Sequence, residues 1–202
     1  MYDHYLFDLD GVIVDVEESY RRRVFDAVAE VLDTSYNDRQ IERLWHGVGA
    51  DTREEIIRSW GDDPEEFWRV FDAVDDPARR IEHTYAYDDA EVLYDVPGPV
   101  GVVTHSPPEL AWPALEVAGI DDAVDEVVCC DPETGYKPDP RPIELCMEGI
   151  GASEDTLMVG DSACDVRGAW NAGIDAGHVD RVGSAVEADH RVTDLFDLPG
   201  VA

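Results

Sequence analysis

Lysine is almost missing from this sequence of 202 residues: of its 15 basic residues all but Lys137 are arginine. Because the chain avoids lysine elsewhere, we expect the one that it keeps to have a chemical role. Positive charge is scarce as well, since 47 acidic residues against 15 basic ones give a net charge of −32. Such a chain would repel polyanions, which argues against nucleic acid and anionic membranes as partners. The acidic residues are spread along the chain, which is typical of a solvated surface in a cytoplasm of high salt, where screening is short-ranged.

Long apolar runs are absent too. Runs such as 100–103 are far too short to cross a bilayer. Met1 is followed at once by polar residues rather than by the apolar segment of a signal peptide, so we expect a cytoplasmic protein. The four cysteines lack the spacing of a zinc site, and we expect reduced, buried thiols at Cys129, Cys130, Cys146 and Cys164. With 44% hydrophobic residues, the chain can form one packed core and a small appended domain.

Short apolar runs alternate with helical segments over most of the chain. The expected strands are 5–9, 100–104, 124–130, 156–159 and 176–179. The expected helices are 107–118, 140–148 and 163–172, each of which starts at a proline or is followed by a glycine. Strands and helices that alternate in this way predict an α/β fold with a Rossmann-like parallel sheet.

Residues 16 to about 88 break this alternation, because helix-start signals follow one another and no strand is evident. The signals are Asn37 with Gln40, Asp51 with Glu54, Asp63-Pro64 with Glu66, and Asp76-Pro77. We therefore predict two domains. Residues 1–15 and 89–202 would form the α/β core, and residues 16–88 an all-helical domain inserted after the first strand.

Two pairs of aspartates are expected at one edge of the sheet. Asp8 and Asp10 are two residues apart at the end of the first strand, which puts both side chains on one side. Asp161 and Asp165 follow the strand 156–159 at the start of a helix, where capping alone would also favour carboxylates. Because ligands bind beyond the carboxyl ends of parallel strands, the four carboxylates would converge there. They predict a site for a hard divalent cation, for which Mg²⁺ is the best candidate.

A hydroxyl and an ammonium group are expected beside these carboxylates. Thr104 ends the strand 100–104, and Lys137 lies in the loop after the next strand. Taken singly, Thr104 is also an ordinary β-branched strand residue and Lys137 an ordinary surface lysine. Together, next to a cation, they form a cradle for a phosphoryl group.

These motifs resemble those of the haloacid dehalogenase-like hydrolases. The matching segments stand in the family's order: FDLDGVIVD at 7–15, the strand end at Thr104, KPDP at 137–140 and GDSACD at 160–165. The helical insertion resembles the cap of the subfamily that contains phosphoglycolate phosphatases and β-phosphoglucomutases. The resemblance covers nearly the whole chain, and four motifs in order are very specific.

The resemblance implies a role for each motif residue. Asp8 would be the nucleophile that forms an aspartyl-phosphate, and Asp10 would protonate the leaving alkoxide and then activate water. Mg²⁺ would be held by Asp8, the backbone carbonyl of Asp10, and Asp161, with Asp165 as a further ligand or directly behind them. The residues that bind the phosphoryl group would be Gly11, Thr104 and Lys137.

The implied function is a Mg²⁺-dependent phosphatase acting on a small phosphorylated metabolite, as a monomer or a small homo-oligomer. Asp10 argues against a dehalogenase, because removal of halide leaves no alkoxide to protonate. The insertion contains no lysine for a Schiff base, which rules out phosphonate cleavage. A sugar phosphomutase of the β-phosphoglucomutase type is the alternative, although such mutases usually carry histidine where this chain has Tyr20. A catalytically silent phosphate-binding relative is a third reading, but it would normally have lost Asp8 or Asp10.

Substrate specificity is expected to come from the helical insertion. Its loop 44–53 contains two glycines and corresponds to a loop that faces the leaving group in relatives. Arg53 could bind a carboxylate or a second phosphate with both arms of its guanidinium, or it could pair with acids on its own helix face. The remaining candidates for substrate contacts are His46, Tyr20 and His105.

Overall fold

The computed structural model describes residues 2–49, 51–184 and 186–199. A six-stranded sheet in the order β5-β4-β1-β6-β7-β8 forms its centre, and all neighbouring strands are parallel. The strands are β1 (His4–Phe7), β4 (Val100–Thr104), β5 (Glu126–Cys129), β6 (Thr156–Gly160), β7 (Asp175–Val179) and β8 (His190–Val192). The predicted parallel α/β fold is confirmed. The edge strand β8 was not predicted, because three residues are too few to show a pattern.

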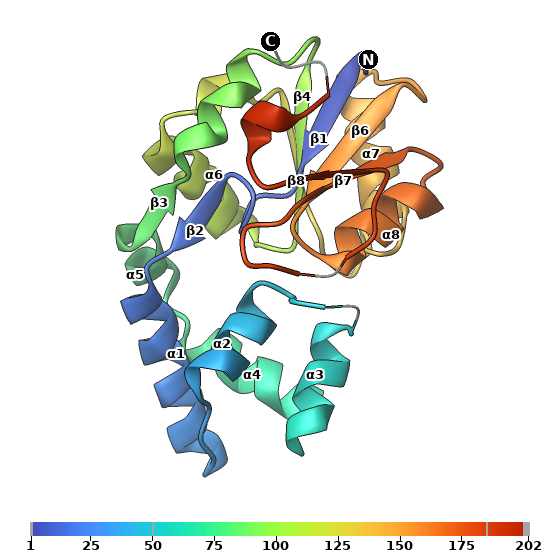
Figure 1. The fold of residues 1–202 in the computed structure, drawn as a ribbon. Coiled ribbons are helices and arrows are strands. Elements are labelled where there is room, and N and C mark those ends of the chain that lie inside the picture. Colours follow the sequence, from blue (N-terminus) through green and yellow to red (C-terminus); the bar gives the residue numbers. More distant parts are fainter. Residues whose placement is uncertain (1, 50, 185, 200–202) are drawn as a thin grey trace.

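Helices cover both faces of this sheet (Figure 1). Tyr5 and Phe7 of β1 pack on one face with residues of α6 (Pro108–Ala118), whereas Leu6 packs on the other face. The second face is covered by α7 (Arg141–Ile150) and α8 (Ala163–Asn171). Because both faces are buried, the central strands are continuous apolar runs rather than alternating ones. Three short 3₁₀ helices complete this part: η1 (Asp88–Tyr94), η2 (Asp121–Ala123) and η3 (Leu195–Asp197).

The inserted helices form a separate group beyond the carboxyl ends of the strands (Figure 1). They are α1 (Glu18–Leu32), α2 (Asp38–Trp45), α3 (Arg53–Trp60), α4 (Pro64–Val74) and α5 (Pro77–Glu82). An aromatic cluster around Phe25, Phe67 and Phe71 gives this group a hydrophobic core of its own. The buried residues of that core lie between 16 and 71. The bounds 16–88 for the helical domain stay a prediction.

The predicted helix starts agree with the structure at three of four places. The side chains of Asn37, Asp63 and Asp76 each accept a hydrogen bond from a backbone N–H of the first turn. At the fourth place the predicted pair Asp51 and Glu54 is wrong by one residue. The capping box is made by Thr52 and Glu55, while the Asp51 carboxylate pairs with Arg43.

The expectation that residues 16–88 contain no strand is wrong. Strand β3 (Thr84–Ala86) pairs antiparallel with β2 (Val14–Val16), and this ribbon carries the chain to the helices and back. Such short strands have no periodicity of their own, and their pairing joins segments about seventy residues apart. The hydroxyl groups of Tyr85 and Tyr87 both donate to the buried carboxylate of Asp15 inside the ribbon.

All four cysteines are free thiols, as predicted. Cys130 and Cys146 are buried, whereas Cys129 and Cys164 are partly exposed, so burial holds for two of the four. Within the described ranges, no helix is both long and apolar enough to cross a membrane.

Candidate active site

The site lies where β1, β4 and β6 end, facing the inserted helices (Figure 1). Asp8 directly follows β1, Thr104 is the last residue of β4, and Asp161 directly follows β6. The register of β1 with β6 pairs Phe7 with Val159, so the residues that follow these strands emerge side by side. The parallel arrangement therefore brings together side chains that are more than 150 residues apart in the chain.

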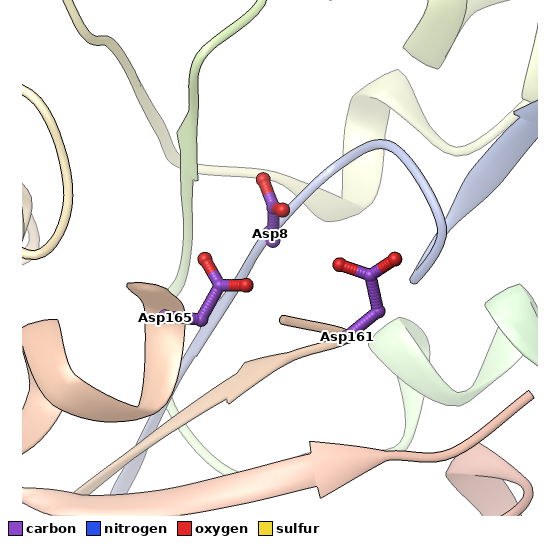
Figure 2. Close-up of side chains that lie close together, drawn as sticks. All are labelled: Asp8, Asp161 and Asp165. Carbon is purple, nitrogen blue, oxygen red and sulfur yellow. The ribbon is translucent and has the colours of Figure 1, made fainter. Parts of the chain in front are cut away.

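Three carboxylates converge at this edge. One oxygen of each of Asp8, Asp161 and Asp165 lies within 4.8 Å of the others. Figure 2 shows the three side chains turned toward a common region, with Asp165 arriving from the first turn of α8. Carboxylates at such distances repel one another unless a positive charge separates them.

Lys137 supplies one such charge. Its Nζ lies 2.9 Å from Asp8 Oδ1 and 2.6 Å from Asp165 Oδ1. It also donates a hydrogen bond of 2.7 Å to the carbonyl oxygen of Val103. The side chain of Lys137 is only 1% exposed, so the three donors of its ammonium group are matched by three oxygens inside the protein. Lysine at this position is thus held as a point charge between the candidate nucleophile Asp8 and the candidate metal ligand Asp165.

The pKa values of the three carboxylates are shifted in different directions by burial and by Lys137. Burial raises the pKa of Asp8 to about 7, although Lys137 acts in the opposite direction. Burial and the neighbouring Asp165 raise the pKa of Asp161 well above its ordinary value. Burial would raise the pKa of Asp165 as well, but Lys137 and a hydrogen bond from Ser162 outweigh it and lower that pKa. The negative charge of Asp165 is therefore already balanced by Lys137 and a hydrogen bond from Ser162.

Asp161 has a buried carboxylate oxygen that could bind a cation. Its Oδ1 is buried and accepts no hydrogen bond within the described residues. Gly11 stands beside the other oxygen, because a Cβ on Gly11 would lie 2.1 Å from Asp161 Oδ2. An orphaned buried carboxylate oxygen costs free energy that a hard cation recovers, so the residues present fit a Mg²⁺ ion.

The side chain of Asp10 is not part of this cluster and has two partners of its own. Its Oδ1 accepts a 2.8 Å hydrogen bond from Arg80 Nη2, and its Oδ2 accepts one of 2.6 Å from Ser106 Oγ. Burial opposes the charged form of Asp10, but Arg80 and Ser106 outweigh it and lower its pKa. Sequence reasoning did not identify Arg80, since one arginine of Arg79-Arg80 in a six-residue helix carries no distinguishing pattern. Thr104 is buried as well, and its Oγ1 accepts a hydrogen bond from the backbone N–H of Ser106.

Arg53 approaches the cluster from the helical side. Its guanidinium donates to the carbonyl oxygens of Leu44 and Trp45, at 3.1 Å each. Burial works against its charge, but Cys164 and then Asp161 and Asp8 raise its pKa. The guanidinium thus lies within electrostatic reach of the carboxylates, held by backbone oxygens.

Of the other specificity candidates, His46 and Tyr20 lie away from the carboxylates, whereas His105 lies close enough to Lys137 and Asp165 to interact with them electrostatically. The ring of His46 is buried 3.8 Å from Asp15 and 3.6 Å from Glu42, beside the β2–β3 ribbon. Tyr20 is buried in the helical group, where its hydroxyl donates to Asp75 at 2.7 Å. His105 is exposed on the loop after β4 and packs edge-on against the ring of Tyr136. The structure therefore does not bring His46 or Tyr20 to the carboxylate cluster.

Comparison with known proteins places the chain among relatives of similar sequence. Residues 5–179 match the family model described as haloacid dehalogenase-like hydrolase. The pyrophosphatase PpaX of Halalkalibacterium halodurans is 27% identical, and the alignment covers 97% of this chain and 96% of that protein. The PpaX of a Bacillus cereus strain is 28% identical over 83% of this chain and 78% of its own length.

Solved structures of the same fold are also similar. A putative phosphoglycolate phosphatase from Lactobacillus plantarum has a TM-score of 0.79 at 20% identity, with 98% of this chain and 97% of that one covered. A HAD phosphatase from Thermococcus onnurineus has a TM-score of 0.68 at 26% identity, with 96% and 95% covered. The predicted fold and the prediction of a hydrolytic enzyme are confirmed, and the chain belongs to the haloacid dehalogenase-like hydrolase family.

Proposed function

We propose that the protein is a Mg²⁺-dependent phosphomonoesterase that acts on a small phosphorylated metabolite through an aspartyl-phosphate. The observation that carries this proposal is the position of Lys137 between Asp8 and Asp165, next to the unpaired oxygen of Asp161. This arrangement offers a nucleophile, a fixed positive charge and a cation site within a few ångströms, which is what phosphoryl transfer needs.

The first half of the reaction uses Asp8 as nucleophile. The backbone N–H of Leu9 and the ammonium of Lys137 both bind Asp8 Oδ1, which fixes the orientation of the carboxylate for its attack on phosphorus. As the new P–O bond forms, the ester bond breaks and the leaving oxygen takes a proton from Asp10, which must bind this proton before the step because Arg80 and Ser106 favour its ionised form. Lys137 and Thr104 would bind the equatorial oxygens of the transferring group.

The second half regenerates the enzyme. Asp10 takes a proton from water while the water oxygen attacks phosphorus, and the Asp8–phosphorus bond breaks to release inorganic phosphate. Asp8, Asp161 and the Asp10 carbonyl would hold Mg²⁺, which when bound offsets the negative charge of the phosphoryl oxygens. Both Asp165 oxygens are already engaged, Oδ1 with Lys137 and Oδ2 with Ser162, so Asp165 would stand behind the ion and fix Lys137.

The relatives suggest which substrates to try. Similar proteins include a pyrophosphatase and a putative phosphoglycolate phosphatase, and a similar structure from Rhodobacter sphaeroides was solved with xylulose-1,5-bisphosphate. Pyrophosphate, phosphoglycolate and this bisphosphate are therefore the first substrates to test. Each of these molecules has a second anionic group besides the phosphoryl group that would react. Arg53 on the helical side would bind that group, which supports a doubly anionic metabolite as substrate.

Release of inorganic phosphate with Mg²⁺ from a panel of such molecules tests the function. The panel holds phosphoglycolate, sugar phosphates, sugar bisphosphates and pyrophosphate, assayed in molar KCl. Turnover of at least one monoester is expected, with loss on the order of 10⁴-fold or more in Asp8→Asn. The exposed Asp121 is the matched control, and Asp121→Asn should behave as wild type. Activity that survives in Asp8→Asn would contradict the covalent mechanism, and hydrolysis confined to pyrophosphate would contradict the monoesterase.

A further inference from the structure

A chain of buried polar side chains leads from the helical group to Asp10. The Tyr20 hydroxyl donates to Asp75 Oδ1 at 2.7 Å, and Arg80 Nη1 lies 3.0 Å from Asp75 Oδ2. The other arm of the same guanidinium, Nη2, binds Asp10 Oδ1 at 2.8 Å. Tyr20 is 2% exposed, and the side chains of Asp75 and Arg80 are 7% and 13% exposed. An ion-pair chain of this kind, shielded from water, holds geometry far better than a surface pair.

Arg80 itself is fixed from several directions. Its guanidinium lies over the indole ring of Trp45, 5.0 Å from the ring centroid, at the end of α2. Its carbonyl oxygen accepts a hydrogen bond from Thr84, the first residue of β3. The planar fork of arginine allows one nitrogen to face Asp75 and the other Asp10, which a single ammonium group cannot do.

We propose that Arg80 is a positioning residue, which together with Ser106 fixes the orientation of the Asp10 carboxylate for its acid–base work. Each donor takes a different oxygen of Asp10, and the two come from opposite sides of the site, Arg80 from α5 and Ser106 from the loop after β4. The carboxylate can therefore neither rotate nor swing out while both bonds are made. Asp75 and Tyr20 hold Arg80 in turn. This inference rests on the proposed function, because that function gives Asp10 its task.

The proposal distinguishes the two halves of the reaction. With p-nitrophenyl phosphate the leaving nitrophenolate is stable without a proton, so transfer to Asp8 does not need Asp10. Hydrolysis of the aspartyl-phosphate still does, because a proton must pass from the attacking water to the Asp10 carboxylate as the Asp8–phosphorus bond breaks. Loss of positioning should therefore slow the second half of the reaction and leave the first half nearly unchanged.

The experiment measures rapid release of nitrophenolate by wild type, Arg80→Ala and Arg79→Ala, with Mg²⁺ present. Arg79 is the matched control, because it is largely exposed and its nearest carboxylate, in Asp76, is 3.8 Å away. Arg80→Ala should lose roughly 10- to 100-fold in kcat, with KM falling in parallel so that kcat/KM is nearly unchanged, and it should show a burst approaching one nitrophenolate per enzyme. Acid quenching during the burst should recover protein phosphorylated on Asp8. Arg79→Ala should follow wild type.

A second variant covers the case in which Arg80→Ala folds poorly. Asp75→Asn leaves Arg80 in place and weakens its support, so kcat should fall by less and a burst should again appear. Arg80→Lys should recover part of the rate, because it keeps one contact of the two. Steady turnover in Arg80→Ala equal to that of Arg79→Ala would overturn the inference, and so would a slower enzyme without a burst. If wild type turned over no phosphate ester at all, the proposed function itself would fail and the inference with it.

Discussion

The two sides of the active site use positive charge differently. On the sheet side Lys137 is enclosed between Asp8 and Asp165, and its ammonium group holds the carboxylate of the nucleophile Asp8 in place. On the helical side Arg53 is held by two backbone carbonyls, and Arg80 binds the Asp10 carboxylate. In a chain with a net charge of −32, these three cations gather around the carboxylates where a phosphoryl group would react.

This comparison teaches that the sheet side uses its lysine to fix the nucleophile, whereas the helical side uses one arginine to fix Asp10 and leaves the charge of the other for a ligand. The buried ammonium group of Lys137 has an oxygen partner for each of its donors, so changes there should affect every substrate alike. Arg53 uses neutral carbonyl oxygens, which leave its charge available to an anionic ligand. Changes on the helical side should therefore alter the choice of substrate or one reaction step rather than all activity.

Replacing the single lysine by arginine should have the largest effect. In Lys137→Arg the charge remains, but a planar fork cannot occupy the space between Asp8, Asp165 and the Val103 carbonyl. We expect kcat to fall on the order of 10²-fold, since small displacements of reacting groups cost that much. Kinetics with the best substrate measure this, and the exchange Arg141→Lys at an exposed position serves as control. Near wild-type kinetics in Lys137→Arg would show that any positive charge suffices.

A smaller effect is expected from a methyl group at Gly11. Gly11 and Gly61 both have positive φ, +80° and +95°, so alanine at either costs about 1 kcal/mol of stability. A Cβ at Gly11 would also meet Asp161 Oδ2 at 2.1 Å, whereas at Gly61 it would meet nothing within 4 Å. Gly11→Ala should therefore raise the Mg²⁺ concentration for half activity by about tenfold, and Gly61→Ala should not. Equal Mg²⁺ dependence in the two variants would remove Asp161 from the proposed cation site.

The pH dependence of Mg²⁺ binding should follow from the raised carboxyl pKa values. Without a cation, burial raises the pKa of Asp8 to about 7, and burial together with the neighbouring Asp165 raises the pKa of Asp161 well above its ordinary value. A group with a raised pKa keeps its proton at lower pH, and Mg²⁺ must displace that proton. The affinity should therefore rise between pH 6 and 8, by up to about tenfold per pH unit for each proton displaced. Calorimetric titration at several pH values would measure it, and constant affinity would contradict the assignment.

Salt should raise the thermal stability of the protein mainly by screening the repulsion among its exposed carboxylates, rather than by changing the active site. The repulsion among exposed carboxylates falls as the screening length drops from about 10 Å at 0.1 M to about 3 Å at 1 M salt. Thermal midpoints should therefore rise steeply with KCl, and at fixed KCl they should rise further with Mg²⁺ by mass action. Scanning calorimetry over a KCl series would decide this. A flat series would leave the acidic composition without the high-salt explanation.

Much of the site could be predicted because its residues sit at defined places in local structure. Asp8 and Asp161 follow apolar strands, Thr104 ends one, and Asp165 lies in the first turn of a helix, so strand direction alone brings them to one edge. Helix starts were predictable for the same reason, since a cap such as that of Asn37 with Gln40 lies within three residues. The shift from Asp51 to Thr52 shows the limit, because neighbouring residues can both cap and tertiary contacts choose between them.

The sequence by itself determined the parallel α/β fold, the helical insertion and the family, because these depend on patterns within single elements and on motifs in order. Tertiary structure alone decided which partners these residues meet. Arg80 and Ser106 reach Asp10 across 70 and 96 residues, and β2 finds β3 across a similar distance. For the same reason His46 meets Asp15 beside the ribbon, and Tyr20 reaches the site only through Asp75 and Arg80. Such contacts form only after the chain has closed long loops, so no local propensity records them.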